Sequence, residues 1–222
     1  MPRVPVAPRI SRSRRCAAFT LIELVAVIVV LGVLMTMGVG LLSGTGAQSR
    51  KVSTDVLIGM IERGRVEAIT SRSPVLLAIA EPGDLPSGDS VCRVGLFELD
   101  EWPSGDVTAV DAVLLSRWKE LKPGVVLTGG EVDGVNNPLD APEITVTYLA
   151  GNSELSVEVH ALVFHSRGGL TYPEGSTPVA FRLAEGRYQN GETILAKSGG
   201  GEGVRESRLK VGRVIARPYR FD

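Results

Sequence analysis

The chain has 222 residues, of which 44% are hydrophobic and 22% are charged, a composition that excludes wholesale disorder and fits one globular domain with an appendage. The formal net charge of −1 averages two unlike parts: residues 1–18 hold five arginines and no acid, which leaves 19 basic and 25 acidic side chains in residues 19–222. A main body with a net charge of −6 is not expected to bind nucleic acid or anionic lipid through its overall charge.

Residues 19–42 form an apolar run of 24 residues in which Glu23 is the only charged side chain. A helix of that length is roughly 36 Å long, enough to cross the ~30 Å hydrocarbon core of a bilayer. The apolar region of a cleaved secretory signal peptide is shorter, about 7–15 residues. Five arginines precede the run and only Arg50 and Lys51 follow it closely. We therefore predict a single-pass membrane anchor with a cytoplasmic N-terminus and an exported head.

Residues 17–24 read AAFTLIEL at the border between the basic leader and the apolar run. This segment resembles the type IV prepilin processing signal, in which a basic leader is cut before a Phe, the new N-terminus is methylated and a Glu follows four residues later. The resemblance implies cleavage between Ala18 and Phe19, N-methylation of Phe19, and a role for Glu23 in filament assembly. The family usually has Gly where this chain has Ala18, which is also small.

Glu23 has two interpretations. By its chemistry alone it is a carboxylate that reaches the membrane interface, since it lies five residues into the apolar run. The resemblance implies instead that it pairs with the positive amine of Phe19, in the same or a neighbouring chain, because a charge buried in a filament is tolerated when it is paired.

Residues 43–73 are predicted to continue as an amphipathic helix that ends before Pro74, since apolar residues recur at steps of three and four from Val52 to Ile69. Residues 74–222 are predicted to form a β-rich head. The expected strands are 75–80, 91–99, 125–127, 144–149, 155–164, 179–183 and 209–216, and residues 109–121 are expected to contain a helical turn or two. The predicted fold class is α+β and pilin-like: a long N-terminal transmembrane and amphipathic helix packed on a mostly antiparallel, β-rich C-terminal head.

Three stretches of the head resemble the H-type minor pseudopilins of type II secretion. Residues 63–78 resemble their helix-then-strand unit, residues 118–127 their Leu-Pro-x-Gly-Val turn, displaced by Lys122, and residues 164–168 their Phe-x-x-x-Gly strand end. The head is equally compatible with a minor pilin of another filament.

Several other patterns predict no catalytic or metal site. Residues 191–198 are one substitution from a phosphate-binding loop, but the glycines that follow indicate a hairpin tip. His160 and His165 are expected on opposite sides of a strand. The oxygen-rich loop 133–140 lacks EF-hand spacing, although calcium binding there stays open. Cys92 is expected to be a buried free thiol once the leader, with Cys16, is removed. We therefore predict no enzyme, no cofactor and no metal.

The C-terminal segment 203–222 is rich in arginine. Gly212 and Arg213 resemble a Gly-Arg pair of minor pilins that act in DNA uptake, so Arg213 and Arg217 are candidate phosphate or DNA contacts. The interpretation that we favour is a solvated β-hairpin whose arginines pair with the acidic body.

Three hypotheses follow: a structural subunit of a secretion pseudopilus or type IV pilus-like filament, which we favour, a DNA-binding minor pilin, and an unprocessed membrane-anchored binding protein. The first implies an inner-membrane location with a periplasmic head. Its partners would be a prepilin peptidase that is also a methyltransferase, other pilins packed through the N-terminal helix, an inner-membrane secretion platform with its ATPase, and membrane lipid. Nucleic acid is not an expected partner.

Overall fold

The computed structural model describes residues 21–85, 90–189, 192–196 and 203–221. The chain divides into two compact units, residues 1–42 and 43–222. The described residues contain one α-helix, α1 (Leu21–Ser71), twelve strands and a short 3-10 helix, η1 (Pro138–Asp140). In these described ranges no helix combines the length and the apolarity needed to cross a membrane. The predicted span 19–42 begins outside them and stays a prediction.

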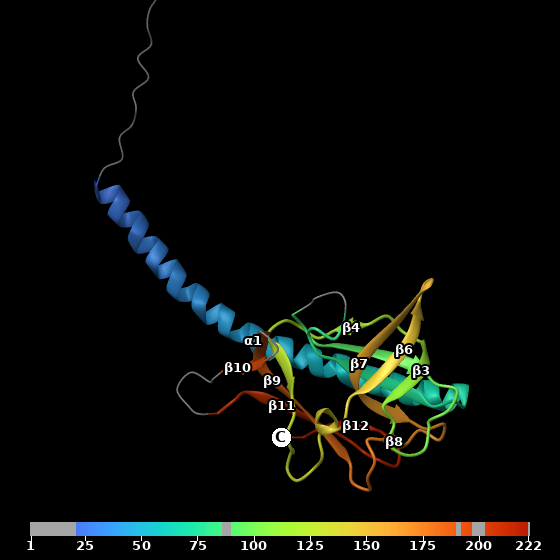
Figure 1. Ribbon diagram of the computed structural model, residues 1–222. Helices are drawn as coiled ribbons and strands as arrows, with labels where there is room; N and C mark the ends of the chain where they lie inside the picture. The colour runs from blue at the N-terminus through green and yellow to red at the C-terminus, as the bar shows by residue number, and fades with distance from the viewer. Residues whose placement is uncertain (1–20, 86–89, 190–191, 197–202, 222) are drawn as a thin grey trace, which may run out of the picture. The chain divides into compact units, whose positions relative to one another are not determined.

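Five strands of the second unit pair in a closed ring, in which each strand has two neighbours: β1 (Val75–Ala80), β2 (Arg93–Glu98), β3 (Ala109–Leu114), β6 (Ile144–Ala150) and β7 (Ser153–Phe164). The antiparallel pairing of β1 with β7 closes the ring. The other neighbours are also antiparallel, except that β3 and β6 run parallel. Two short strands extend it, β4 (Lys119–Glu120) beside β2 and β8 (Leu170–Tyr172) beside β7. Figure 1 shows β6 and β7 as a long hairpin.

Strand β1 supplies side chains to two separate cores. Leu76, Ala78 and Ala80 belong to the core inside the ring, where aromatic edges meet around Phe97. The alternate side chains, at positions 75, 77 and 79, belong to a second core that includes α1. All six residues of β1 are buried, so the strand has a continuous apolar run instead of an alternating one.

The second core lies between the ring, α1 and a second sheet. The helix contributes Leu57, Met60, Ile61 and Ala68, spaced so that they share one face. The second sheet has the order β10-β9-β11-β12, with β5 also beside β9. Its strands are β5 (Val125–Thr128), β9 (Val179–Gln189), β10 (Glu192–Leu195), β11 (Glu206–Val211) and β12 (Pro218–Phe221). Within this unit, Figure 1 shows the C-terminal part of α1 running alongside the strands.

Helix α1 approaches the ring closely at Gly64. A Cβ atom there would lie 2.8 Å from Cδ2 of Leu96 and 2.9 Å from Cε2 of Phe164, so only glycine fits without displacing core side chains. An ion pair of Arg50 with Glu185, 3.3 Å between Nη1 and Oε1, joins the helix to β9.

The end of α1 follows from local chain chemistry. The helix stops at Ser71, and Arg72 takes a left-handed φ of 60°. Pro74 has no N–H for a further helical hydrogen bond, and it disfavours helical geometry in the residue before it. The amphipathic helix predicted over 43–73 is therefore helical to within two residues of its expected end.

The predicted fold class, an α+β pilin-like fold with a long helix packed on a mostly antiparallel head, is wrong. The described residues are mostly β, with a single helix, and five of the strands close on themselves. The physical reason is that the head has an apolar interior of its own inside the ring. A head that merely packed on a helix would have one core. Apolar runs such as 75–80 do not reveal from sequence that their two faces enter different cores.

The helical turns predicted within 109–121 are also wrong. This segment contains strands β3 and β4. Val110, Val113 and Leu114 have a spacing that suits a helix, but in β3 only Val110 is buried and Val113 points outward. Strands β8, β10 and β12 had not been predicted as separate elements. Each is four residues or fewer, too short for a clear periodicity.

Candidate functional site

The structure describes little of the segment that contains the predicted processing residues. Ala18 and Phe19 are outside the described residues, and Glu23 lies in the first turn of α1 without a described side chain. The expected cleavage, N-methylation and assembly contact at these three positions therefore stay predictions.

Arg213 lies in the turn between β11 and β12, and it binds the chain itself. Its Nε donates a 2.9 Å hydrogen bond to the carbonyl of Thr177, and Nη1 donates to the carbonyl of Pro173. Burial lowers the pKa of this guanidinium. Two of its nitrogen atoms are thus engaged with backbone, so Arg213 holds the loop after β8 against the C-terminal hairpin.

The other arginines of the C-terminal segment fall into two groups. Arg208 pairs with Glu206 and Asp133, at 2.8 Å and 3.1 Å, and Arg220 pairs with Asp55 of α1. Arg205 and Arg217 are exposed and have no ion pair within the described part of the chain. Of the two predicted phosphate contacts, Arg217 alone presents its charge to solvent.

The oxygen atoms of the loop 133–140 are used within the protein. Asp140 accepts hydrogen bonds from the N–H of Gly130, at 2.8 Å and 3.0 Å, and Asp133 pairs with Arg208. The Asn137 side chain donates to the carbonyl of Thr128 and caps η1. The described residues contain no cluster of His, Cys, Asp or Glu with the geometry of a metal site.

The two histidines have different surroundings. His160, on β7, has Nε2 3.4 Å from Oε1 of Glu143. His165 accepts a 3.0 Å hydrogen bond at Nδ1 from the N–H of Arg167, and burial, followed by the charge of Arg167, lowers its pKa.

Cys92 is a buried free thiol, as predicted from the sequence. Burial raises its pKa well above the ordinary value, with a smaller contribution from the nearby carboxylates of Glu81 and Asp84. The thiol is therefore kept protonated inside the core.

A hollow of about 600 Å³ lies between the loop after η1 and the end of β8, lined by Tyr172, Glu131 and Asp106 among others. Two of its polar side chains, Asn137 and Asp140, are occupied in holding the neighbouring loop. Its chemistry does not point to one class of ligand.

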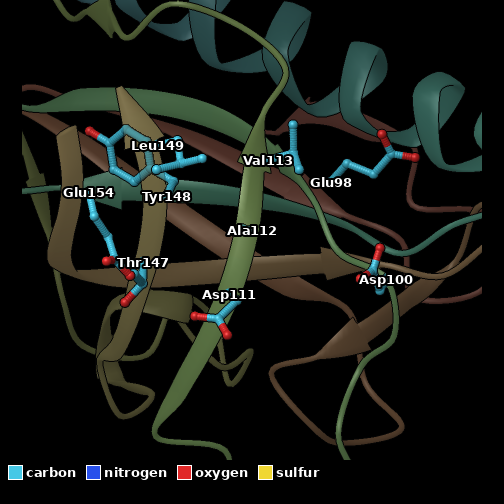
Figure 2. A pocket seen from close by; sticks show the side chains of 9 residues that line it. All are labelled: Glu98, Asp100, Asp111, Ala112, Val113, Thr147, Tyr148, Leu149 and Glu154. Atoms are coloured by element: carbon cyan, nitrogen blue, oxygen red, sulfur yellow. The ribbon is translucent and has the colours of Figure 1, made fainter. Parts of the chain in front are cut away.

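A smaller groove of about 240 Å³ lies on the outside of the ring over β3 and β6 (Figure 2). Val113 is 65% exposed and Leu149 is 69% exposed, one on each of these strands. Val113 lies opposite Glu98 in the register of β2 and β3, and Leu149 lies opposite Glu154 in that of β6 and β7. An aliphatic side chain thus stands beside a carboxylate on both sides of the groove. We call this surface the acidic groove.

Four carboxylates line the acidic groove, those of Glu98, Asp100, Asp111 and Glu154. Figure 2 shows Glu98 and Asp100 on one side of strands β3 and β6, and Glu154 on the other. None of the four has an ion-pair partner among the described residues. The parallel pairing that brings β3 and β6 together, with Asp111 beside Thr147, joins residues far apart in sequence. The groove was therefore not predicted from the sequence.

A second surface has the opposite charge. In the turn after β11, Val214 is 82% exposed and Ile215 is 54% exposed, and Arg217 follows them. Gly169 packs against the backbone of this turn, and Arg167, two residues before Gly169 in the chain, is exposed. We call residues 213–217 together with Arg167 the basic turn.

The comparisons with known proteins locate one feature of the chain. Residues 13–39 match the prokaryotic N-terminal methylation motif, which confirms the processing signal predicted from residues 17–24. No curated protein and no solved structure matches the chain. The motif implies processing by a prepilin peptidase and assembly with other pilins.

Proposed function

We propose that this chain, a type IV pilin-like precursor by its methylation motif, is a structural minor subunit of a type II secretion pseudopilus or a related filament. The observation that carries the proposal is the match over residues 13–39, which includes Ala18, Phe19 and Glu23. No catalytic role is proposed for the head. The local resemblance of residues 63–78 to the H-type pseudopilins supports the choice of a minor subunit, since a helix that ends at Ser71 is followed there directly by β1.

In this proposal the leader is cut after Ala18 and the amine of Phe19 is methylated. The methylated amine keeps its positive charge, and Glu23 of the same or a neighbouring chain supplies the opposite charge. Since a buried unpaired charge is costly, this pairing favours one register between adjacent subunits. Glu23 is therefore an assembly residue.

The proposal places residues 19–42 in the inner membrane and the head in the periplasm. The arginine-rich leader supports a cytoplasmic N-terminus. The partners are a prepilin peptidase that is also a methyltransferase, sibling pilins or pseudopilins, membrane lipid and an inner-membrane platform with its ATPase.

Mass spectrometry of the protein purified from its native membrane tests this maturation. We expect a chain that begins at Phe19 and carries one added methyl group. As a matched comparison, Ala18→Gly restores the residue usual in the family and is expected to be processed at least as fast. Recovery of intact chains that keep all five leader arginines would overturn the proposal and favour an unprocessed membrane anchor.

A Glu23→Ala substitution tests the assembly role. We expect the variant to be cleaved and methylated normally but not to co-sediment with wild-type filaments, because the amine of Phe19 then lacks its partner. Glu67→Ala, which removes a carboxylate from the described part of α1, is the control and is expected to co-sediment. Normal assembly of the Glu23→Ala variant would contradict the assembly role.

A further inference from the structure

We propose that the acidic groove of one copy of this chain binds the basic turn of a second copy, so that heads join head to tail. The inference rests on the proposed function, because only a protein that assembles brings many heads together. It adds the specific surfaces through which the heads meet.

The acidic groove has the composition of a docking surface. Its centre is apolar, since Val113 and Leu149 are among the most exposed large aliphatic side chains that the structure describes. Its border is charged, with carboxylates from β2, β3 and β7 and the loop after β2. An apolar centre within a polar rim is the usual arrangement of a protein–protein contact. The four carboxylates without ion-pair partners call for a cationic occupant.

The basic turn has the matching chemistry. Val214 and Ile215 extend from the end of a hairpin, and Arg217 and Arg167 are exposed cations without an ion pair among the described residues. A partner that presents two aliphatic side chains together with exposed arginines fits a groove that has two exposed aliphatic side chains and four carboxylates. This correspondence within one chain identifies a second copy as the occupant.

The basic turn is also held in shape before it binds. The N–H of Leu170 donates a 2.8 Å hydrogen bond to the carbonyl of Arg213, and the N–H of Gly212 donates to the carbonyl of Arg217 at 3.1 Å. The Arg213 guanidinium fixes the turn from its other side through Thr177. Because the turn is already ordered, less conformational entropy is lost on binding.

The geometry of such a contact favours an open chain of heads. The groove and the turn are different surfaces, so the contact between them is heterologous, and each copy keeps one free groove or one free turn for the next. Heterologous contacts extend into filaments wherever the rotation between neighbours does not close a ring.

Disulfide crosslinking between two copies tests the contact. Full-length chains with different tags are co-expressed in the native membrane, one with Leu149→Cys and the other with Val214→Cys. Both carry Cys16→Ser, and Cys92 is buried and stays silent. Mild oxidation is expected to give a product that contains both tags. Pairing Leu149→Cys with Ile194→Cys, an exposed position on β10, is the matched control and should give none.

Charge reversal tests whether the carboxylates take part. Glu154→Lys in the groove chain is expected to lower the yield of the two-tag product about tenfold. Arg217→Glu in the turn chain is expected to restore much of that yield when the two are combined, because the pair of charges is then exchanged. Restoration excludes misfolding of either variant as the cause of the loss.

The crosslinking results distinguish failure of the head-to-tail contact from failure of the proposed function. A product of Leu149→Cys with itself, or with another protein, in place of the two-tag product would overturn the head-to-tail contact. The N-terminus is sequenced by mass spectrometry in the same sample. Mature chains beginning at Phe19 that form no two-tag product overturn the contact and leave the proposed function intact. Unprocessed chains overturn the proposed function, whichever crosslink result accompanies them.

Discussion

The thiol of Cys92 has no access to solvent and a pKa that burial raises far above its ordinary range. Because the thiolate is the reactive form, we expect Cys92 in the folded protein not to react with iodoacetamide at neutral pH. It should react fully once the protein is unfolded in guanidinium. The measurement is the mass of the alkylated protein against time. A Leu149→Cys variant, with its new thiol on the surface, provides the reactive control, and rapid labelling of native Cys92 would contradict this prediction.

Glu81 lies beside β1, close to Asp84, Glu143 and His160. Burial raises its pKa above the ordinary 4.5; the two carboxylates add to the rise and His160 opposes it. A raised folded-state pKa means that the folded protein binds the proton more tightly than the unfolded chain. The ionised carboxylate therefore weakens the fold at neutral pH. This loss of stability diminishes as the pH falls through the raised pKa toward the ordinary value, and it is absent below that value.

Replacing Glu81 by Gln removes that pH-dependent loss. We expect a Tm above that of the parent protein at pH 7 to 8, and a difference that shrinks as the pH is lowered toward 4.5. Glu154→Gln, at the exposed end of β7, should change the Tm little at any pH. Scanning calorimetry across the pH range measures the Tm of both variants. A lower Tm for Glu81→Gln at pH 7 would contradict this prediction and show that the charge of Glu81 stabilises the fold.

Some candidate residues can be recognised from the sequence, and others only from the structure. The motif around Phe19 and Glu23 is linear, because a peptidase reads a contiguous segment, and the sequence alone predicted it. Val113 and Leu149 were missed, since only the pairing of β3 with β6 makes them neighbours. A signal existed in the alternating pattern of residues 109–114, AVDAVL, which identifies a strand with an outward Asp111 and Val113 when it is read with period two.

At the scale of elements, two of the glycines in α1, Gly59 and Gly64, offer a matched pair of substitutions. A Cβ at Gly59 would meet nothing within 4 Å, whereas one at Gly64 would overlap Leu96 and Phe164. We expect Gly59→Ala to stabilise the protein by about 0.5–1 kcal/mol, because alanine is the better helix former.

Gly64→Ala gains the same helix propensity but must displace two fully buried side chains. We expect a net loss of about 1–3 kcal/mol in the free energy of unfolding. Denaturant titration of the mature protein in detergent, followed by helical ellipticity, measures both changes. Equal effects of the two substitutions would contradict the close contact between α1 and the ring.

Several elements could be predicted from sequence, and their arrangement could not. The strand expected at 75–80 coincides with β1, and the one at 144–149 falls within β6, because apolar runs between turn residues indicate strands locally. The closure of the ring depends on β1 pairing with β7, whose residues lie some eighty positions further along the chain. Local patterns carry no information on such a pairing, and this is where the predicted fold class failed.

At the scale of the whole molecule, the two cores of the head share strand β1. Because its alternate side chains enter different cores, neither core can lose its packing without disturbing the other. We expect the head to unfold in one transition, with tryptophan fluorescence, which reports on the ring through Trp118, coinciding with helical ellipticity.

Phe97→Ala, inside the ring, should lower the free energy of unfolding by about 3–5 kcal/mol and shift both signals together. Phe181→Ala, in the core against α1, should also shift both. Separate transitions for the two signals would show that the cores are independent.

The closed ring has a consequence for how these heads tolerate crowding. Strands with unpaired edges can recruit strands from other molecules and begin aggregation, but each of the five ring strands already has a neighbour on both sides. The strands with a single partner, β4, β5, β8, β10 and β12, have two to four residues each, and β12 begins with Pro218, which has no N–H to offer. In the proposed filament, such heads would be protected from exchanging strands, so contacts between them would be made by side chains, which are reversible and selective.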